Sequence, residues 1–249
     1  MVRDCTADAI FHSYSDAEGT VSETMKIGNA EIEVDKIIRS SRRTLSIAVT
    51  GDGEVVVRAP RSLPEEIIYG MVKGKSSWIK RKKAEAESRR VPPHRFLQGE
   101  KFLFLGRSYP LLLVDGVGIN VDLTDNLVIS CGKEDIRTIL IHWYEDRAEE
   151  EIGKRCLLYF NLTGLKPKNV KISKAEKRWG SCSSRGNLNF AWRLVMAPFE
   201  IIDYVVVHEL VHLEEMNHSG WFWKKVASIM PDYERRRRWL SENGSRLRL

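Results

Sequence analysis

Three of the six histidines in this chain of 249 residues lie within a stretch of eleven residues, and two of them form an HExxH motif. The motif is His208-Glu209-Leu210-Val211-His212. Four residues on an α-helix turn through about 400°, so the two imidazoles lie about 40° apart on one face. Glu209 lies about 100° from His208 and can reach a water molecule without being a ligand. Two metal ligands and a general base in this arrangement are typical of zinc peptidases.

Chance and a purely structural role are the alternatives for this motif. A chain of this length and composition would contain it about 0.013 times by chance. The motif also lies in an apolar stretch, residues 201–213, where polar side chains lower stability unless they have partners. Two hydrogen-bonded core histidines would also meet that condition, but we favour the metal site.

A catalytic zinc ion needs a third protein ligand and an open fourth position. His218 follows the motif by six residues. Asn217 can adopt a left-handed conformation and end the helix near Met216, so the chain could fold back and bring His218 to the metal. Ser219 would then be the N-cap of a helix over residues 221–230. We therefore expect this histidine and the two of the motif to hold one Zn²⁺ per chain.

Three glutamates compete with His218 for the role of third ligand. Glu234 is the main rival, because a glutamate from a following helix is the third ligand in thermolysin-like enzymes. Glu214 and Glu215 share the helix of the motif and are too close to it in sequence to curl round onto the same metal. We favour His218 over all three.

The segment before the motif is predicted to bind substrate. Residues 170–196 are expected to form a hairpin, with residues 188–196 as its second strand. An edge strand at this place could pair with an extended peptide through backbone hydrogen bonds. Gly180 would let the peptide backbone approach closely, and Trp179 would offer an apolar wall. An ordinary core position for Trp179 is the open alternative.

A peptidase also needs a donor to the oxyanion that forms during hydrolysis. Arg178 and Tyr233 are the candidates, and an ordinary buried tyrosine is the alternative for Tyr233.

The basic run 235–238 is expected to be a solvated stretch of helix, with a phosphate-contacting patch near the active site as the alternative.

The composition fits a globular protein. Hydrophobic residues make up 43 % and charged residues 30 % of the chain, and the formal net charge is +6, which permits a polyanionic partner without requiring one. No uncharged apolar run approaches the roughly 20 residues that span a bilayer, and residues 1–20 lack the apolar core of a secretory signal. None of the four cysteines has CxxC spacing. We therefore expect a cytoplasmic protein with reduced thiols and no membrane association.

The pattern of apolar residues predicts an α+β protein with two halves after a tail. Residues 1–20 are expected to be a disordered tail. Residues 21–131 read as a β-rich subdomain that includes a hairpin, residues 45–59, and a helix with Ser62 as its N-cap. Residues 132–249 read as the catalytic subdomain, beginning with a long helix to about Phe160. The β-rich half is expected to pack against the catalytic half without carrying the chemistry.

Several motifs around the histidines resemble those of a known family. They are Lys177–Cys182, Asn187–Phe190, Trp192–Leu194, Ile202–Leu210, Asn217–Ser219, Phe222–Trp223 and Met230–Tyr233. In these the chain resembles the YgjP-like metallopeptidases, which are similar to SprT-like and WLM zinc peptidases. The resemblance is specific over residues 168–240 and looser in the N-terminal half. It implies a zincin-like catalytic half, zinc on the three histidines and Glu209 as general base, but it implies no particular substrate.

These observations favour a zinc-dependent metallopeptidase that acts on proteins or peptides. The alternative is a nucleic-acid-associated protein that processes or binds proteins on DNA, as SprT-like enzymes do. Its support is the basic charge balance, and no DNA-reading motif accompanies it. A structural metal site without catalysis is a third possibility, against which the intact Glu209 counts. The oligomeric state does not follow from the sequence.

Overall fold

The computed structural model of the chain describes residues 22–26, 33–88, 92–115, 120–130 and 135–249. The predicted tail therefore lies outside the described residues. The chain divides into two compact units, one that ends at Pro92 and one that contains residues 93–249. In the part of the chain so described, no helix has the length and apolar character needed to cross a membrane.

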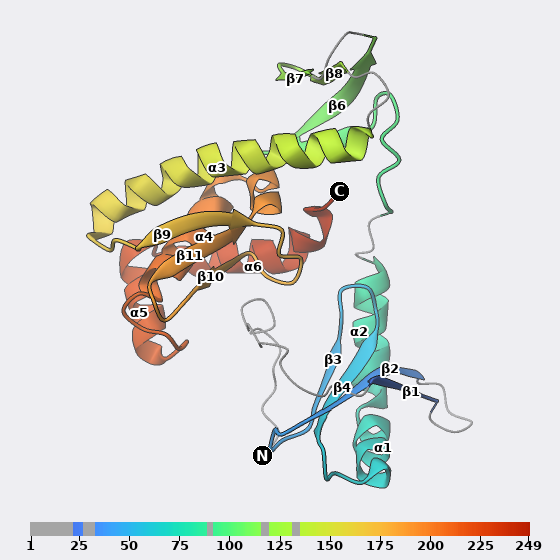
Figure 1. The fold of residues 1–249 in the computed structure, drawn as a ribbon. Coiled ribbons are helices and arrows are strands. Elements are labelled where there is room, and N and C mark those ends of the chain that lie inside the picture. Colours follow the sequence, from blue (N-terminus) through green and yellow to red (C-terminus); the bar gives the residue numbers. More distant parts are fainter. Residues whose placement is uncertain (1–21, 27–32, 89–91, 116–119, 131–134) are drawn as a thin grey trace. The chain divides into compact units, whose positions relative to one another are not determined.

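The first unit is a four-stranded sheet with two helices (Figure 1). Its elements are β1 (Ser22–Lys26), β2 (Glu33–Ser40), β3 (Ser46–Val49), β4 (Val55–Pro60), α1 (Glu65–Gly74) and α2 (Ser76–Ser88). The strand order is β1-β2-β4-β3, and β3 and β4 pair antiparallel as the predicted hairpin. Gly53 closes its turn with a φ of 85°. The N-cap of α1 is Pro64 and not Ser62, so the helix begins later than predicted.

The second unit begins with another sheet and a long helix (Figure 1). The elements are β5 (Lys101–Phe104), β6 (Arg107–Val114), β7 (Asn120–Leu123), β8 (Leu127–Ser130) and α3 (Ile136–Thr163). The strand order is β5-β6-β8-β7. Asp135 caps the start of α3, because its carboxylate accepts a hydrogen bond from the Thr138 N–H. Gly164 ends the helix in the left-handed conformation.

This second sheet shares its hydrophobic core with the helices that follow, so the division of the chain lies at Pro92 and not near residue 131 as the sequence suggested. Phe102 and Leu111 are buried in the same core as α3. The Tyr144 hydroxyl of α3 donates to the Leu103 carbonyl at 2.7 Å. Local strand patterns cannot reveal which core a sheet joins, because that depends on contacts between segments far apart in the sequence.

Glu100 organises the turn that leads into β5. Its carboxylate accepts hydrogen bonds from the backbone N–H groups of Arg95 and Leu97, each at 3.1 Å, and its Oε1 lies 2.8 Å from the Nδ1 of His94. The His94 ring in turn stacks on Phe102 at 4.5 Å. Burial raises the pKa of Glu100, but these hydrogen bonds outweigh it and lower the pKa below its ordinary value.

The rest of the second unit contains a small sheet and the helices of the candidate site. Its elements are β9 (Asn169–Ser173), β10 (Gly180–Cys182), β11 (Asn187–Ala191), the 3₁₀ helix η1 (Trp192–Met196), α4 (Phe199–Val211), α5 (Gly220–Ile229), α6 (Tyr233–Asn243) and the 3₁₀ helix η2 (Gly244–Arg246). α3 packs against α4, η1 and β9, and α4 packs against α5, α6 and β10 (Figure 1).

The hairpin of the small sheet differs from the predicted one. The strand order is β10-β11-β9, with β10 and β11 antiparallel and β9 and β11 parallel. The hairpin therefore consists of β10 and β11, and Gly186 closes its turn with a φ of 77°. The predicted second strand also ends early, because residues 192–196 form η1. Both β10 and β9 are edges of this sheet, and β10 is the edge that packs against α4, the helix of the HExxH segment.

α4 is the central helix of this unit. Every residue from Ile201 to Val211 is buried, which explains the apolar stretch in the sequence. The helix ends at Val211, with His212 as C-cap in the right-handed conformation. It does not continue to Met216, and Asn217 is not among the described residues with positive φ. The helix thus stops one turn earlier than the sequence suggested.

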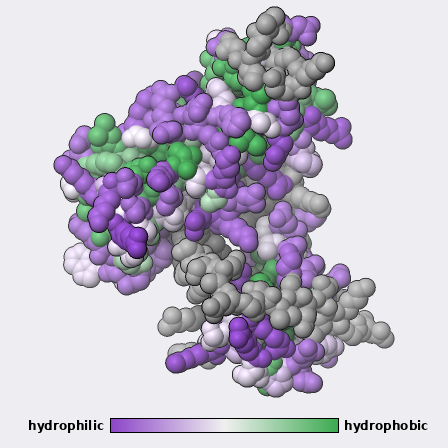
Figure 2. Space-filling view, viewed as in Figure 1, coloured by the Kyte–Doolittle hydropathy of each residue, from purple (hydrophilic) through white to green (hydrophobic). Residues whose placement is uncertain are grey.

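The visible surface is mainly hydrophilic, with a few hydrophobic patches (Figure 2). Among the described residues, the exposed large apolar side chains include Leu157 and Leu162 near the end of α3 and Trp221 in α5. The exposed fraction of Trp221 is 73 %, which is high for a tryptophan.

Candidate metal centre

Three histidines from two helix ends and the loop between them converge in the second unit. His208 lies in the last turn of α4, His212 is its C-cap, and His218 precedes the N-cap of α5. One ring nitrogen from each lies within 4.8 Å of the others. The Nε2 atoms of His208 and His218 are 2.9 Å apart. The predicted ligands therefore lie together, in an arrangement that could hold one metal ion.

The turn after α4 orients His212. The N–H groups of Leu213 and Glu214 donate to carbonyls of the last helical turn, at 3.0 Å each. This tight turn brings the Glu215 carbonyl to 2.9 Å from the Nδ1 of His212. A carbonyl can only accept, so Nδ1 carries the proton and donates it. The Nε2 lone pair of His212 is then available to a metal, as in most histidine ligands.

The N-terminus of α5 positions His218. Ser219 is the N-cap as predicted, and its hydroxyl accepts from the Phe222 N–H at 3.3 Å. The ring of Phe222 contacts all three imidazoles, with centroid distances of 4.6 to 4.8 Å. Trp223 stacks on His218 at 5.7 Å, with 23° between the ring planes. The sequence places both aromatic residues only in a family motif, because their position against the histidines depends on how α5 packs.

The apolar surroundings favour the neutral form of two of the imidazoles, those of His208 and His212. Burial lowers the pKa of His208, and the neighbouring histidines lower it further. Burial also lowers the pKa of His212. Neutral imidazole is the form that binds a metal ion. The donor set therefore fits a divalent cation such as zinc, which prefers nitrogen ligands of this kind.

Glu209 directly follows His208 in α4 and is buried, with an exposed fraction of 1 %. Burial raises the pKa of its carboxyl to about 8, although the charge of Arg178 acts in the opposite direction. Among the described residues its Oε1 has no hydrogen-bond partner. A buried carboxyl oxygen without a protein partner is rare. A water molecule or a substrate group would supply the missing hydrogen bond.

The absence of a side chain at Gly180 leaves room for the side chain of Glu209. A Cβ atom at Gly180 would lie 2.6 Å from both the Cγ and the Oε1 of Glu209, closer than any ordinary contact. Gly180 is the first residue of β10, the edge strand. The edge strand thus lies directly against the proposed general base.

The two residues before Gly180 have different surroundings. Trp179 is 7 % exposed and belongs to the hydrophobic core. The guanidinium of Arg193 lies 4.3 Å above its ring, and the same guanidinium donates to the Ala175 carbonyl at 3.3 Å. Trp179 therefore supports the edge strand from the core and offers no open wall to a substrate. Arg178 is half-buried, and its positive charge opposes the effect of burial on the pKa of Glu209.

Tyr233 and Glu234 lie at the start of α6. The ring of Tyr233 stacks on Trp223 at 5.3 Å, and its hydroxyl donates to the Glu234 carboxylate at 3.3 Å. Tyr233 is thus one ring away from His218. Glu234 is exposed and is not part of the histidine cluster.

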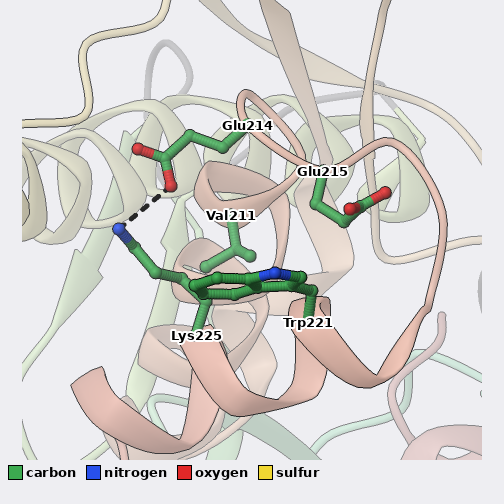
Figure 3. A pocket seen from close by; sticks show the side chains of 5 residues that line it. All are labelled: Val211, Glu214, Glu215, Trp221 and Lys225. Atoms are coloured by element: carbon green, nitrogen blue, oxygen red, sulfur yellow. Dashed lines mark ion pairs between the residues drawn. The ribbon is translucent and has the colours of Figure 1, made fainter.

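A cavity of about 260 Å³ adjoins the loop that joins His212 to His218. Figure 3 shows the flat ring of Trp221 beneath Val211, with Glu214, Glu215 and Lys225 around it. Glu214 forms an ion pair with Lys225 at 3.0 Å. The carboxylates of Glu214 and Glu215 therefore line this cavity, and neither joins the histidine cluster.

A partly buried ion pair joins α4 to α3. The Arg155 guanidinium donates two hydrogen bonds to the Asp203 carboxylate, at 2.5 and 2.7 Å. The Asp203 side chain is 9 % exposed and that of Arg155 is 27 % exposed. Because Asp203 lies five residues before His208 on the same helix, this pair helps to set the position of the ligand-bearing turn.

Comparison with known proteins gives one match. The family model "YgjP-like, metallopeptidase domain" matches residues 43–243, most of the chain. The match includes the three histidines, Glu209 and the edge strand, and it confirms the resemblance seen in the sequence. No curated protein and no solved structure matches the chain.

Proposed function

We propose a zinc-dependent peptidase activity for this chain, which belongs to the YgjP-like family of metallopeptidase domains. In this proposal the second unit is a zincin-like catalytic domain, and His208, His212 and His218 hold one Zn²⁺. The observation that carries it is the convergence of three ring nitrogens within 4.8 Å, together with a buried glutamate directly after His208 whose Oε1 has no partner among the described residues. When bound, zinc would act as a Lewis acid that activates water and polarises a carbonyl.

Glu209 is the proposed general base. Its carboxylate would accept a proton from the attacking water and later deliver it to the nitrogen of the leaving amine. A base works best when its pKa is close to the working pH, and burial raises the pKa of Glu209 to about 8. Arg178, whose charge reaches the same carboxyl, would stabilise the negative charge that develops on the substrate oxygen. Tyr233 is a second candidate for that role.

The proposed substrate is an extended segment of a protein or peptide. β10 is an edge strand, so it can hydrogen-bond to a further strand on its outer side. Gly180 has no side chain to keep that segment away from Glu209. A peptide paired with β10 would therefore pass close to the proposed base. We retain the cytoplasm as its expected place of action.

The nucleic-acid alternative draws on the run of arginines in α6. Arg235 and Arg236 are already paired with Asp232, at 2.7 and 2.9 Å, which reduces the charge that they could offer to phosphates. If binding to DNA were the main function, retention on DNA would fall steeply with salt, and substitution of Glu209 would not change it.

The test combines metal analysis with hydrolysis of an unfolded protein. Glu209→Gln keeps the size of the side chain but removes the base, so zinc content and thermal stability should stay close to those of the parent. Hydrolysis should fall by about 10²- to 10⁴-fold, the usual effect of losing a general acid–base. Unchanged hydrolysis in the variant would exclude Glu209 as the base. A zinc-loaded parent that cleaves no substrate on a broad panel would contradict the peptidase assignment.

A further inference from the structure

The ring of Phe222 and the three imidazoles form a cluster of four rings. The centroid of the Phe222 ring lies 4.8 Å from those of His208 and His218 and 4.6 Å from that of His212. The imidazoles lie 4.9, 4.9 and 4.8 Å from one another. Each ring centre is therefore almost equally far from the other three, as at the corners of a regular tetrahedron.

This arrangement limits the side of the imidazoles on which a metal ion can lie. Because Phe222 is almost equidistant from the three imidazoles, its ring centre lies on the axis through the middle of their triangle. A zinc ion held by all three lies close to the same axis, since each nitrogen binds at about 2.0–2.1 Å. The phenyl ring fills this axis on one side and offers no ligand atom. That leaves the opposite side for an ion and its open position.

The ring of Phe222 is itself fixed from several directions. It is 0 % exposed and lies in the hydrophobic core of the second unit. The Ser219 hydroxyl accepts a hydrogen bond from the Phe222 N–H at 3.3 Å. The ring of Trp223 packs against the phenyl ring at 5.0 Å, with 88° between the planes. Because Ser219 directly follows His218, one helix cap ties the phenyl ring to the loop that carries this histidine.

Phe222 differs in its contacts from the other aromatic residues at the start of α5. Trp223 lies against His218 and His208, at 5.7 and 5.9 Å, and Trp221 is 73 % exposed. Phe222 is the aromatic side chain of this helix that lies against all three proposed ligands. A buried phenyl ring packed against three imidazoles restricts the rotation of each imidazole about its side-chain torsions.

We propose that Phe222 is a positioning residue of the metal centre, which holds the three imidazoles in their binding geometry and closes the centre on the side of α5. This inference rests on the zinc site of the proposed function and adds a residue that shapes it. Without the phenyl ring the imidazoles would gain rotational freedom, and metal binding would have to order them against their conformational entropy. The ion would then be bound more weakly, and the looser ligands would let it take further water molecules.

The first test measures the affinity of the full chain for Zn²⁺ by competition with a chelator. Phe222→Ala should weaken zinc binding by about 10- to 100-fold, the usual effect of losing a group that supports metal ligands. Phe222→Leu keeps much of the apolar volume and should lose a smaller factor. Phe102→Ala is the control, because it removes the same ring from the same core at a residue that is 1 % exposed and stacks on His94 and Phe96. The control should bind zinc as tightly as the parent.

The absorption spectrum of the Co²⁺ form adds a readout that a loss of general stability would not change. Cobalt bound by three imidazoles and one water absorbs strongly in the visible range, and this absorption weakens when further water molecules bind. The spectrum of Phe222→Ala should therefore be several-fold weaker than that of the parent, and the spectrum of Phe102→Ala should be unchanged. If Phe222→Ala does not fold, Phe222→Leu takes its place in both measurements.

Unchanged zinc affinity or an unchanged Co²⁺ spectrum in a folded Phe222 variant would overturn the inference, and so would an equal loss in Phe102→Ala. Neither measurement involves hydrolysis, so the inference and the peptidase proposal can fail separately. A parent that binds zinc but cleaves nothing would contradict the peptidase proposal, while weaker binding by Phe222→Ala would still support the positioning role. A parent that binds no zinc would contradict both.

Discussion

Replacing Gly180 by alanine should disable the proposed general base while leaving the three histidines in place. The new Cβ would lie 2.6 Å from the Cγ and the Oε1 of Glu209, whereas ordinary contacts begin near 3.4 Å. The carboxylate or the edge strand must therefore move by about 0.8 Å. Displacements of about 1 Å in a catalytic group cost roughly 10²-fold in rate, and overpacking of a buried site costs about 1–3 kcal/mol of stability. We expect losses of that size from one methyl group.

The assay measures zinc content, the free energy of unfolding in urea, and hydrolysis of an unfolded protein. Zinc content should match that of the parent. Gly153→Ala is the control, because a Cβ at this helical position meets no atom within 4 Å. That variant should keep full activity and gain up to about 1 kcal/mol of stability from the helix propensity of alanine.

A double-mutant cycle shows whether contact with Glu209 causes the effect. In a Glu209→Ala background the clashing atoms are absent, so Gly180→Ala should then cost little stability. Gly180 does not adopt the left-handed conformation, so backbone strain would not explain a loss. The reasoning is refuted if Gly180→Ala retains full activity, or if its cost in stability is the same with and without the Glu209 side chain.

Three further predictions test other parts of the structure. His218→Ala should lose most of the bound zinc and Glu234→Ala should keep it; the reverse result in metal analysis would make Glu234 the third ligand. Asp203→Asn should lower the free energy of unfolding by about 1–3 kcal/mol, because it leaves the partly buried Arg155 without its ion pair; an unchanged urea midpoint would show that the pair contributes nothing. Glu100→Gln should destabilise the protein at pH 7. The lowered pKa of Glu100 stabilises the fold above its ordinary value of 4.5, so this difference should disappear as the pH falls below 4.5; a difference that persists in acid would contradict it.

Some features of this protein follow from short stretches of sequence. The spacing of His208 and His212 places them on one face of any helix that forms there. Ser219 caps the next helix because its hydroxyl needs only the backbone three residues ahead. The hairpin of β3 and β4 likewise follows from alternating apolar residues and a glycine turn. Each feature depends on contacts between residues that are close in the sequence, so the local sequence determines it.

Other features depend on contacts between distant segments, and the sequence alone left them open or predicted them wrongly. The parallel pairing of β9 with β11 and the core shared by β5 and α3 are set by packing across the fold. Trp179 is buried because Arg193 and the core enclose it.

The four arginines of α6 show the limit most clearly, because they are identical in type and adjacent in sequence. The helix turns each of them by about 100° from the last, and the packing of α6 decides which one meets Trp223. That residue is Arg237, and only the tertiary structure brings it over this ring.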